Sequence, residues 1–389
     1  MDSSSLGERI RSVRRRRGLT QGELAAAAGV SLSLVKKLEQ GTIEDVRLET
    51  LHKFAIALKV PTSHLVVGPE QPDPVAPERW DDVREALYRG APDGGFSEEA
   101  TPDGVLASLA SLMPAWRANE YSQVHGLLPA LIRDALSLGG DGRTARSRVL
   151  NATAWLLTMT RQFDDALTAA RLALDAAPDV QDSMAAVGVM AWCLLRQGRL
   201  GEAGDLAVEW ADRAEPRFSR AADAELAAYG KVLLYVNNAM VRDNRPGEAE
   251  DALSLARAAA AKIRRDVPAN ASTTMTFGPA QVQIIGAENA SLVGQPDRVL
   301  ALAGQIPGSA LAQVEPAQRL RHRLDVAGAH VSMRQYAESM AVLREIHGAA
   351  PEWLVHQRYA RDTLSRIIQR RRTLTAEMRE LADAVRLPL

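Results

Sequence analysis

The sequence predicts an all-α protein in two parts, a small helical domain at the N-terminus and a long α-solenoid of paired helices. Three observations lead to this prediction. Alanine, leucine and arginine, which lose little conformational freedom in a helix, dominate the composition. Runs of β-branched residues with the period of two that a strand requires are nearly absent. From residue 105 onward, helical patterns follow one another, separated by short polar breaks.

Composition limits the class of protein. Of the 389 residues, 46% are hydrophobic and 24% are charged, as in an ordinary folded chain with room for two or more domains. The single cysteine, Cys193, excludes a disulfide framework and is interpreted as a small buried hydrophobe. No apolar stretch approaches the roughly 18 residues of a membrane span, and the N-terminus lacks the apolar core of a signal peptide. A cytoplasmic protein without membrane partners is therefore expected.

Charge is distributed unevenly along the chain, although the net charge is only −1. Residues 1–68 carry 11 Lys and Arg against 7 Asp and Glu, and the remaining residues carry a small excess of acid. A basic end on a mildly acidic body indicates that only the N-terminal part meets a polyanion.

The N-terminal part, residues 1–68, is predicted to contain five helices. Gly18 ends the first helix, and Thr20 with Glu23 forms a capping box that begins the second. The expected helices cover residues 6–17, 21–28, 32–40, 48–58 and 60–67.

The second and third of these helices form a recognisable pair. Ala25 is small where the two helices must cross closely, and Gly29 permits a sharp turn without a Cβ clash. The apolar residues expected to lock the pair are Leu24, Val30, Val35 and Leu38. These residue types at this spacing are typical of a helix-turn-helix, whose second helix enters the major groove of DNA.

With its flanking helices, the segment resembles the DNA-binding domain of the phage repressor and Cro family. The stretches "RRRRGLTQGELAAAAGVS" and "KKLEQG" carry the resemblance, which covers about the first 68 residues. It implies a repressor-like domain that binds double-stranded DNA as a homodimer, with half-sites about one helical turn apart or a multiple of it. It also implies a buried ion pair between Arg14 and Glu39.

The resemblance further implies which residues face DNA. Gln21, Lys36 and Arg47 are expected to contact phosphates. The residues expected to face base edges or the groove wall are Ser31, Leu32, Ser33 and Lys37. The full set is Thr20, Gln21, Ser31, Leu32, Ser33, Lys36, Lys37 and Arg47.

The sequence departs from its relatives at two places. Leu32 and Leu34 replace residues that are usually polar, and Glu44 and Asp45 lie where the DNA backbone is expected to pass. Leu32 is expected to contact a thymine methyl group, and Leu34 to pack against a neighbouring helix or a second subunit. The alternative for both is partial burial. With few bidentate donors on this helix, readout of DNA shape gains importance.

Residues 69–104 are interpreted as a linker. Four prolines between residues 69 and 77 prevent a helix and stiffen the chain. A short helix is expected in "WDDVREALYRG", with Trp80, Val83 and Leu87 on one face.

Residues 105–389 are predicted to form the helical repeat domain. The pattern resembles a degenerate tetratricopeptide repeat, whose usual period is about 34 residues, with breaks roughly 37 to 50 residues apart. The breaks are counted at Tyr121, Phe163, Leu200, Pro246, Pro296 and Tyr336. The alternative is a helical bundle without a superhelical groove.

The first helix of each pair is expected to line a concave surface that binds an effector. Asparagine amides can clamp a peptide backbone and tryptophans can stack on a ligand, although filling the core between repeats is the alternative for each tryptophan. The candidate effector-binding residues are Asn151, Trp155, Trp192, Asn238, Arg242 and Glu288.

Repressor-like domains joined to such arrays resemble the peptide-pheromone receptors of Gram-positive bacteria and a set of actinobacterial regulators. This implies a cytoplasmic, nucleoid-associated transcription regulator whose array senses a peptide or small-molecule effector, mediates dimerisation, or both. The alternative is a scaffold whose array recruits a partner protein. No nucleophile triad, metal cluster or phosphate loop is apparent, so no enzyme activity, metal or cofactor is expected.

Overall fold

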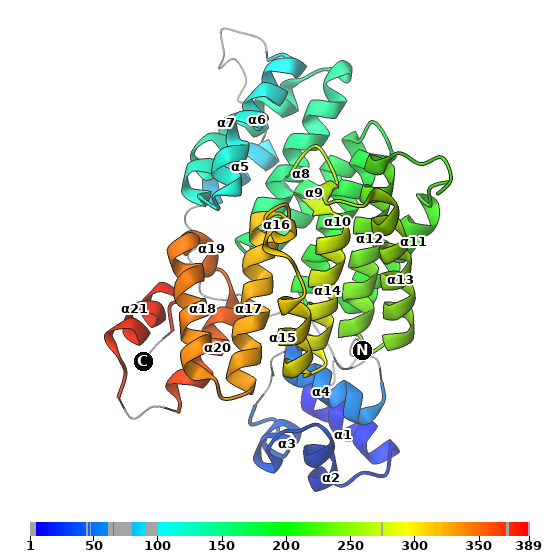
Figure 1. The fold of residues 1–389 in the computed structure, drawn as a ribbon. Helices are drawn as coiled ribbons and strands as arrows, with labels where there is room; N and C mark the ends of the chain where they lie inside the picture. The colour runs from blue at the N-terminus through cyan, green and yellow to red at the C-terminus, as the bar shows by residue number, and fades with distance from the viewer. Residues whose placement is uncertain are drawn as a thin grey trace.

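The computed structural model describes residues 5–43, 46, 48–60, 65, 80–89, 100–273, 275–370 and 373–387. These residues are almost entirely helical, which confirms the all-α prediction (Figure 1). The N-terminal domain, coloured blue in Figure 1, lies at the bottom of the view, beneath the middle of the series of helix pairs and not at its first or last pair. Within the described ranges, no helix is both long and apolar enough to cross a membrane.

The N-terminal domain has the predicted helices within a residue or so at each end. They are α1 (Leu6–Arg16), α2 (Gln21–Ala27), α3 (Leu32–Glu39) and α4 (Leu48–Leu58). Its core is formed by fully buried side chains, among them Ile10, Leu24, Val35, Leu38 and Phe54. The fifth helix, predicted over residues 60–67, lies mostly outside the described residues. Leu65, which the structure does describe, is buried in the same core.

The repeat domain is built from consecutive helix pairs, as predicted. The pairs are α6 (Pro102–Arg117) with α7 (Tyr121–Ser137), α8 (Arg143–Met159) with α9 (Phe163–Ala176), α10 (Val180–Arg196) with α11 (Leu200–Arg213), α12 (Asp223–Arg242) with α13 (Pro246–Ile263), α14 (Pro279–Leu292) with α15 (Pro296–Gly304), and α17 (Pro316–Ser332) with α18 (Tyr336–Ala349). All six predicted breaks coincide with the first residue of a second helix.

The turn inside each pair follows one rule. Each consists of three residues, and the middle residue has a positive φ in the left-handed region. Glycine and asparagine tolerate this conformation best, and two arginines also adopt it here. The six residues are Asn119, Arg161, Gly198, Asn244, Gly294 and Arg334. The same turn geometry therefore recurs along the array, although the repeat lengths differ.

Further helices close the two ends of the array. The helix α5 (Asp81–Arg89), which sequence analysis placed in the linker, packs on α7 and buries Trp80, Val83 and Leu87 in the repeat-domain core. Its Arg84 forms an ion pair with Asp165 of α9 at 2.7 Å. The remaining elements are η3 (Gly140–Gly142), α16 (Gly308–Leu311), α19 (Pro351–Leu354), α20 (Arg358–Ile368) and α21 (Ala376–Ala384).

A small hairpin interrupts the series between α13 and α14. Its strands β1 (Val267–Pro268) and β2 (Thr276–Phe277) are antiparallel, with Val267 opposite Phe277. The hairpin packs on α12, where the fully buried Phe277 ring fills the space that a Cβ at Gly230 would need. Ser272 also accepts a hydrogen bond from Asn151 of α8 at 2.5 Å. The hairpin thus lies against the inner helices of the array.

The N-terminal domain meets the array at the turn between α12 and α13. The Nδ1 atom of His52, on α4, lies 2.9 Å from the carbonyl oxygen of Arg242. Because a carbonyl can only accept, Nδ1 carries the hydrogen in this bond. Asn244, the left-handed residue of the turn, donates from its side chain to the carbonyl oxygen of Val60 at 3.4 Å.

Candidate DNA-binding surface and buried polar centre

The pair α2 and α3 is held by a tight turn and two helix caps. Gly29 lies in the turn with φ of 63°, a conformation that glycine adopts without strain. Thr20 and Glu23 form the predicted capping box at the start of α2. Ser31 caps α3 by accepting a hydrogen bond from the backbone N–H of Leu34 at 3.1 Å.

A buried ion pair joins α1 to α3, as the resemblance implied. Arg14 donates to Glu39 through Nε at 2.6 Å and through Nη2 at 2.8 Å. Gln21 donates to the same carboxylate at 2.9 Å. Burial raises the pKa of Glu39, but the hydrogen bonds from Arg14 and Gln21 outweigh it and hold the pKa below its usual range. The negative charge of the Glu39 carboxylate is therefore balanced by the Arg14 guanidinium. Glu39 is the only acidic residue of α3.

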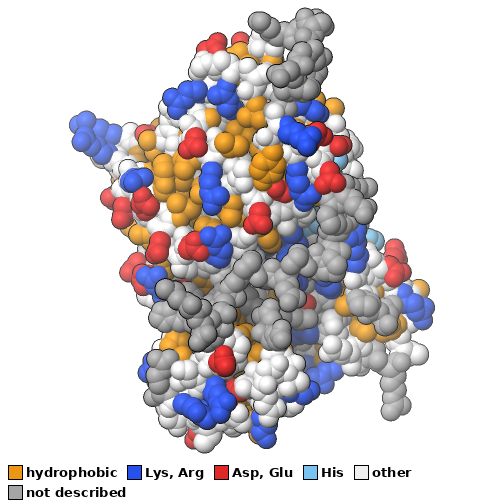
Figure 2. Space-filling model, turned by 180° about the vertical axis from the view of Figure 1, so that it is seen from behind, with side chains coloured by type: hydrophobic (Ala, Val, Ile, Leu, Met, Phe, Trp, Pro, Cys, Tyr) orange, Lys and Arg blue, Asp and Glu red, His pale blue; other side chains and the backbone are white. Residues whose placement is uncertain are grey.

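The opposite face of α3 is exposed. Val35 and Leu38 point into the core, whereas Ser31, Leu32, Ser33, Lys36 and Lys37 are exposed. Leu32 keeps 41% of its surface exposed, so it is not a core residue, and Leu34 is half-buried. Lys and Arg side chains are visible on this domain at the lower end of the back view in Figure 2.

The remaining predicted DNA contacts differ in their exposure to solvent, and one of them is not described by the structure. Thr20 is exposed beside α2, and Gln21 is half-buried with its side chain directed to Glu39. Arg47, together with Glu44 and Asp45, lies outside the described residues.

The six candidate effector residues lie on the inner helices α8, α10, α12 and α14, as expected, but all six are buried. Their exposed fractions run from 1% for Asn151 to 7% for Arg242. Asn151 is engaged by the hairpin through Ser272. Trp155 and Trp192 are part of the repeat-domain core. The inner face is therefore filled by side chains and by the hairpin.

Three of the candidates form the centre of a buried polar cluster. Arg242 donates to Glu288 at 2.5 Å and to the backbone oxygen of Asn238 at 3.1 Å. The carboxylate of Glu288 is buried, which raises its pKa, but Arg242 and Arg321 outweigh burial and lower it.

Sequence analysis missed two members of this cluster, both on α17. The Arg321 guanidinium lies 4.6 Å from the ring centre of Trp192 and 3.5 Å from Glu288. Burial and the nearby charge of Glu288 raise the pKa of Asp325 to about 7. Their spacing of four residues puts both on one face of α17, the same spacing that joins Asn238 and Arg242 on α12. This spacing of four residues is the sequence feature that could have identified Arg321 and Asp325.

Lys231 is buried beneath the hairpin. Its Nζ lies 3.4 Å from the carbonyl oxygen of Thr276, and burial lowers its pKa to about 8 against the opposing effect of Glu315 and two further carboxylates. Cys193 is buried as predicted, and burial raises its thiol pKa to about 12, so it is protonated at neutral pH. Among the described residues, no group of three or more His, Cys, Asp or Glu is placed to hold a metal ion.

Comparisons with known proteins agree with the geometry of the N-terminal domain. Residues 5–65 match the family model described as a helix-turn-helix domain. Over 65 residues the chain is 36% identical to the uncharacterised HTH-type transcriptional regulator RghRB of Bacillus subtilis, an alignment that covers 17% of this chain and 47% of that protein. The chain thus spans about half the length of this relative. The predicted helix-turn-helix domain is confirmed.

Among solved structures, the chain is similar to Bacillus thuringiensis PlcR in complex with the peptide PapR7 and DNA. The superposition covers 87% of this chain and 99% of that chain, with a TM-score of 0.36 and 14% sequence identity.

Proposed function

We propose that this protein is a sequence-specific DNA-binding transcription regulator. The exposed face of α3 carries the proposal. It presents Lys36 and Lys37 together with small polar and apolar side chains, while the one acid of the helix, Glu39, is buried in an ion pair. A helix with this distribution can approach a polyanion without repulsion.

The residues of this surface divide into two roles. Ser31, Ser33 and Lys37 would face base edges, and Leu32 would contact a thymine methyl group. Lys36, Thr20, Gln21 and Arg47 would contact the phosphate backbone. For Gln21 this requires its amide to turn from Glu39 to DNA, which leaves both hydrogen bonds of Arg14 to Glu39 in place.

On DNA, the protein would act as a homodimer in the cytoplasm, associated with the nucleoid. Paired N-terminal domains would contact half-sites about one helical turn apart or a multiple of it.

The repeat domain would sense a peptide or small-molecule effector, mediate dimerisation, or both. The proposed inner-face site comprises Asn151, Trp155, Trp192, Asn238, Arg242 and Glu288. All six side chains are buried, and an effector that reaches Asn151 would have to displace the hairpin that engages it.

The test is selection of DNA from a random library, followed by affinity measurements over a salt series. Wild-type protein is expected to enrich one motif, with an affinity that falls steeply as salt rises. Lys37→Glu is expected to abolish specific binding, because it places a negative charge at the groove. Arg117→Glu makes the same charge change at the exposed end of α6, a helix at the other end of the molecule from α3 (Figure 1), and should bind normally.

A scaffold whose array recruits a partner protein is the alternative function, and the same experiment separates the two. A wild-type protein that enriches no motif, or a Lys37→Glu variant that binds the selected DNA as well as wild type, would overturn the regulator proposal in favour of a scaffold.

A further inference from the structure

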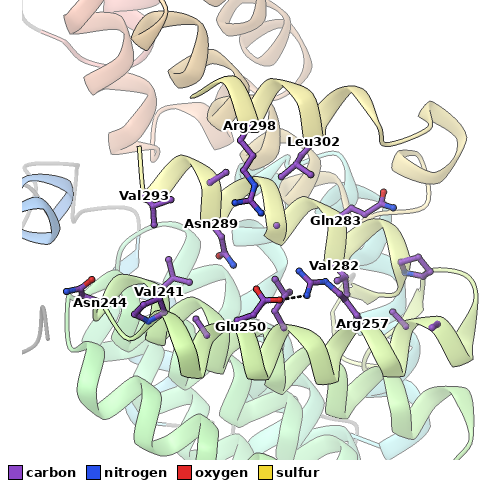
Figure 3. A pocket seen from close by; sticks show the side chains of 18 of the residues that line it. Val241, Asn244, Glu250, Arg257, Val282, Gln283, Asn289, Val293, Arg298 and Leu302 are labelled. Carbon is purple, nitrogen blue, oxygen red and sulfur yellow. Dashed lines mark hydrogen bonds and ion pairs between the residues drawn. The ribbon is translucent and has the colours of Figure 1, made fainter. Parts of the chain in front are cut away.

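An elongated groove lies between α13 and the pair α14 and α15, and none of the six candidate effector residues lines it. It has a volume of about 570 Å³, within the range of roughly 300–1,000 Å³ typical of small-molecule sites. One face of α13 forms its floor, and α14 and α15 form the opposite wall (Figure 3). Along α13 the lining runs from Pro246 to Ala261, a helix length of about 22 Å.

The groove exists because the helices on either side of it are held apart. The hairpin segment 264–278, which is longer than the connections between the other helix pairs, separates α13 from α14. Small side chains then leave the space between them open. These are Ala249 and Ala260 on α13 and Gly286 and Ala290 on α14. A Cβ placed at Gly286 would meet no atom within 4 Å.

The walls are mostly apolar, and the charges at the rim do not cancel. Glu250 and Arg257, both on α13, neutralise each other in an ion pair of 2.6 Å. Arg298 of α15 reaches over the groove, where its contact is the side-chain oxygen of Gln295 at 3.3 Å. Among the residues that the structure describes, no carboxylate lies within ion-pair distance of Arg298. Arg298 therefore places one positive charge, without a paired carboxylate among the described residues, above the apolar groove.

A second polar group points into the same space. The amide of Asn289 projects from α14 toward α13 (Figure 3), and its Oδ1 atom is shielded from solvent with no hydrogen-bond donor among the described residues. The Nδ2 group of the same amide can donate a hydrogen bond to an anionic head group beside Arg298, whereas Oδ1 can only accept from a donor.

One end of the groove reaches the N-terminal domain. His52 of α4 lines it, next to Val241 near the end of α12 and Asn244 of the turn that carries the domain contact. A ligand that fills this end touches both domains at the hydrogen bond between His52 and Arg242. Its binding energy then depends on how the two domains are placed, which is the requirement for a ligand to change DNA binding.

We propose that this groove binds a small amphipathic anion, with its apolar body between α13 and α14 and its single negative head at Arg298 and Asn289. Such a ligand stabilises the arrangement in which the N-terminal domain contacts the α12–α13 turn and thereby alters DNA affinity. The second statement rests on the proposed regulator function, whereas the first does not.

Isothermal titration of the full-length protein with decanoate, in the absence of DNA, tests the site. We expect saturable binding of one decanoate per chain. Gly286→Leu fills the open space from a helical position and should abolish it, while its higher helix propensity preserves the fold. Gly126→Leu is the matched control, because Gly126 is an exposed helical glycine of α7 with equally open surroundings, and it should bind decanoate as wild type does. Absence of binding, or equal binding by Gly286→Leu, would overturn the proposal.

The chemical class is tested with the head group. Arg298→Gln should weaken decanoate binding about tenfold or more and leave binding of the neutral analogue decan-1-ol unchanged. Equal losses for both ligands, or no loss for either, would contradict an anion site.

DNA affinity measured with and without decanoate tests the link between the domains. Decanoate should change the affinity of wild-type protein for its selected motif and leave that of Gly286→Leu unchanged. Calorimetric binding with no change in DNA affinity overturns the link. If the protein binds no DNA at all, the regulator proposal fails, while the calorimetric result still decides the groove.

Discussion

Glu39 lies on the helix proposed to meet DNA, and its burial with Arg14 decides whether that helix can approach phosphates. Removing the carboxylate charge leaves the Arg14 guanidinium buried without a counter-charge, which typically costs about 3 kcal/mol. Glu39→Gln should therefore accelerate hydrogen exchange in peptides from α1 and α3 of the full-length protein. Glu23→Gln is the control, because glutamine can still close a capping box. Equal protection in the two variants would contradict the role of the ion pair.

The same pair predicts an acid limit for the N-terminal domain. The folded-state pKa of Glu39 lies below its ordinary value, so its stabilising contribution is present above that ordinary value of about 4.5 and is lost as pH falls through the folded pKa. In the Glu39→Gln variant, this part of the acid sensitivity should disappear from the exchange profile.

Lys231 predicts an alkaline effect in the repeat domain. Its pKa is about 8 when folded against an ordinary 10.5, so the unfolded chain holds a proton that the folded protein releases, and stability should rise between these values by an amount on the order of 3 kcal/mol. Lys231→Met should abolish this rise and be neutral or stabilising at pH 7. Guanidinium unfolding followed by tryptophan fluorescence measures it, because all six tryptophans lie at or beyond residue 80. The same pH profile in both proteins would contradict a buried ammonium.

At the residue scale, what the sequence predicts depends on how local the signal is. The Arg14–Glu39 pair was predictable because the resemblance to a known domain relates the two positions directly. The engagement of Asn151 was not predictable, since it depends on a hairpin more than a hundred residues away. Arg321 and Asp325 join the cluster only because α17 packs beside α14.

Among the secondary-structure elements, the turn between α2 and α3 is the one that orients the proposed reading helix. Gly29 has a positive φ, whereas Gly22 lies inside α2 with open surroundings. Gly29→Ala should destabilise the N-terminal domain by about 1 kcal/mol, and Gly22→Ala should stabilise it by about 0.5–1 kcal/mol. Hydrogen exchange of α2 and α3 peptides reports both changes, and the same sign for the two substitutions would contradict the turn geometry.

The helix pairs were predictable because the polar breaks that begin the second helices are local signals, and each lies next to a left-handed turn residue. The hairpin was not predictable, since the segment "RDVPANASTTMTFG" has no alternating pattern. Its strands are only two residues long and depend on packing of Phe277 against Gly230 of α12. The helix α5 was predicted from its apolar face, but its place in the repeat domain was not, because only its packing on α7 assigns it there.

At the scale of the whole molecule, contact between the two domains should depend on pH. Burial lowers the pKa of His52 and the Arg242 charge adds to this, whereas its hydrogen bond to the Arg242 carbonyl and the charge of Asp243 oppose it. A domain that has moved away takes up a proton at the ordinary value near 6.5, so the contact is favoured above that pH and weakens as pH falls below it.

Distances between spin labels on cysteines introduced at Glu8 and Arg117, two exposed positions, measure this. The distribution should broaden between pH 7.5 and pH 5.5 in wild type, with a much smaller change in His52→Gln. His347→Gln, on α18, should behave as wild type. An unchanged distribution in wild type would contradict the role of His52. The position of the N-terminal domain was beyond sequence analysis, because the contact joins residues nearly two hundred positions apart.

The most direct test of the central claim, that α3 reads DNA, is the affinity of wild-type and Lys37→Glu proteins for the motif that wild type selects from random duplexes. The account predicts tight, salt-dependent binding by wild type and no preference for the motif over competitor DNA in Lys37→Glu, with equal hydrogen-exchange protection of α1 to α4 in both. Equal affinity of the two proteins for the motif would contradict it.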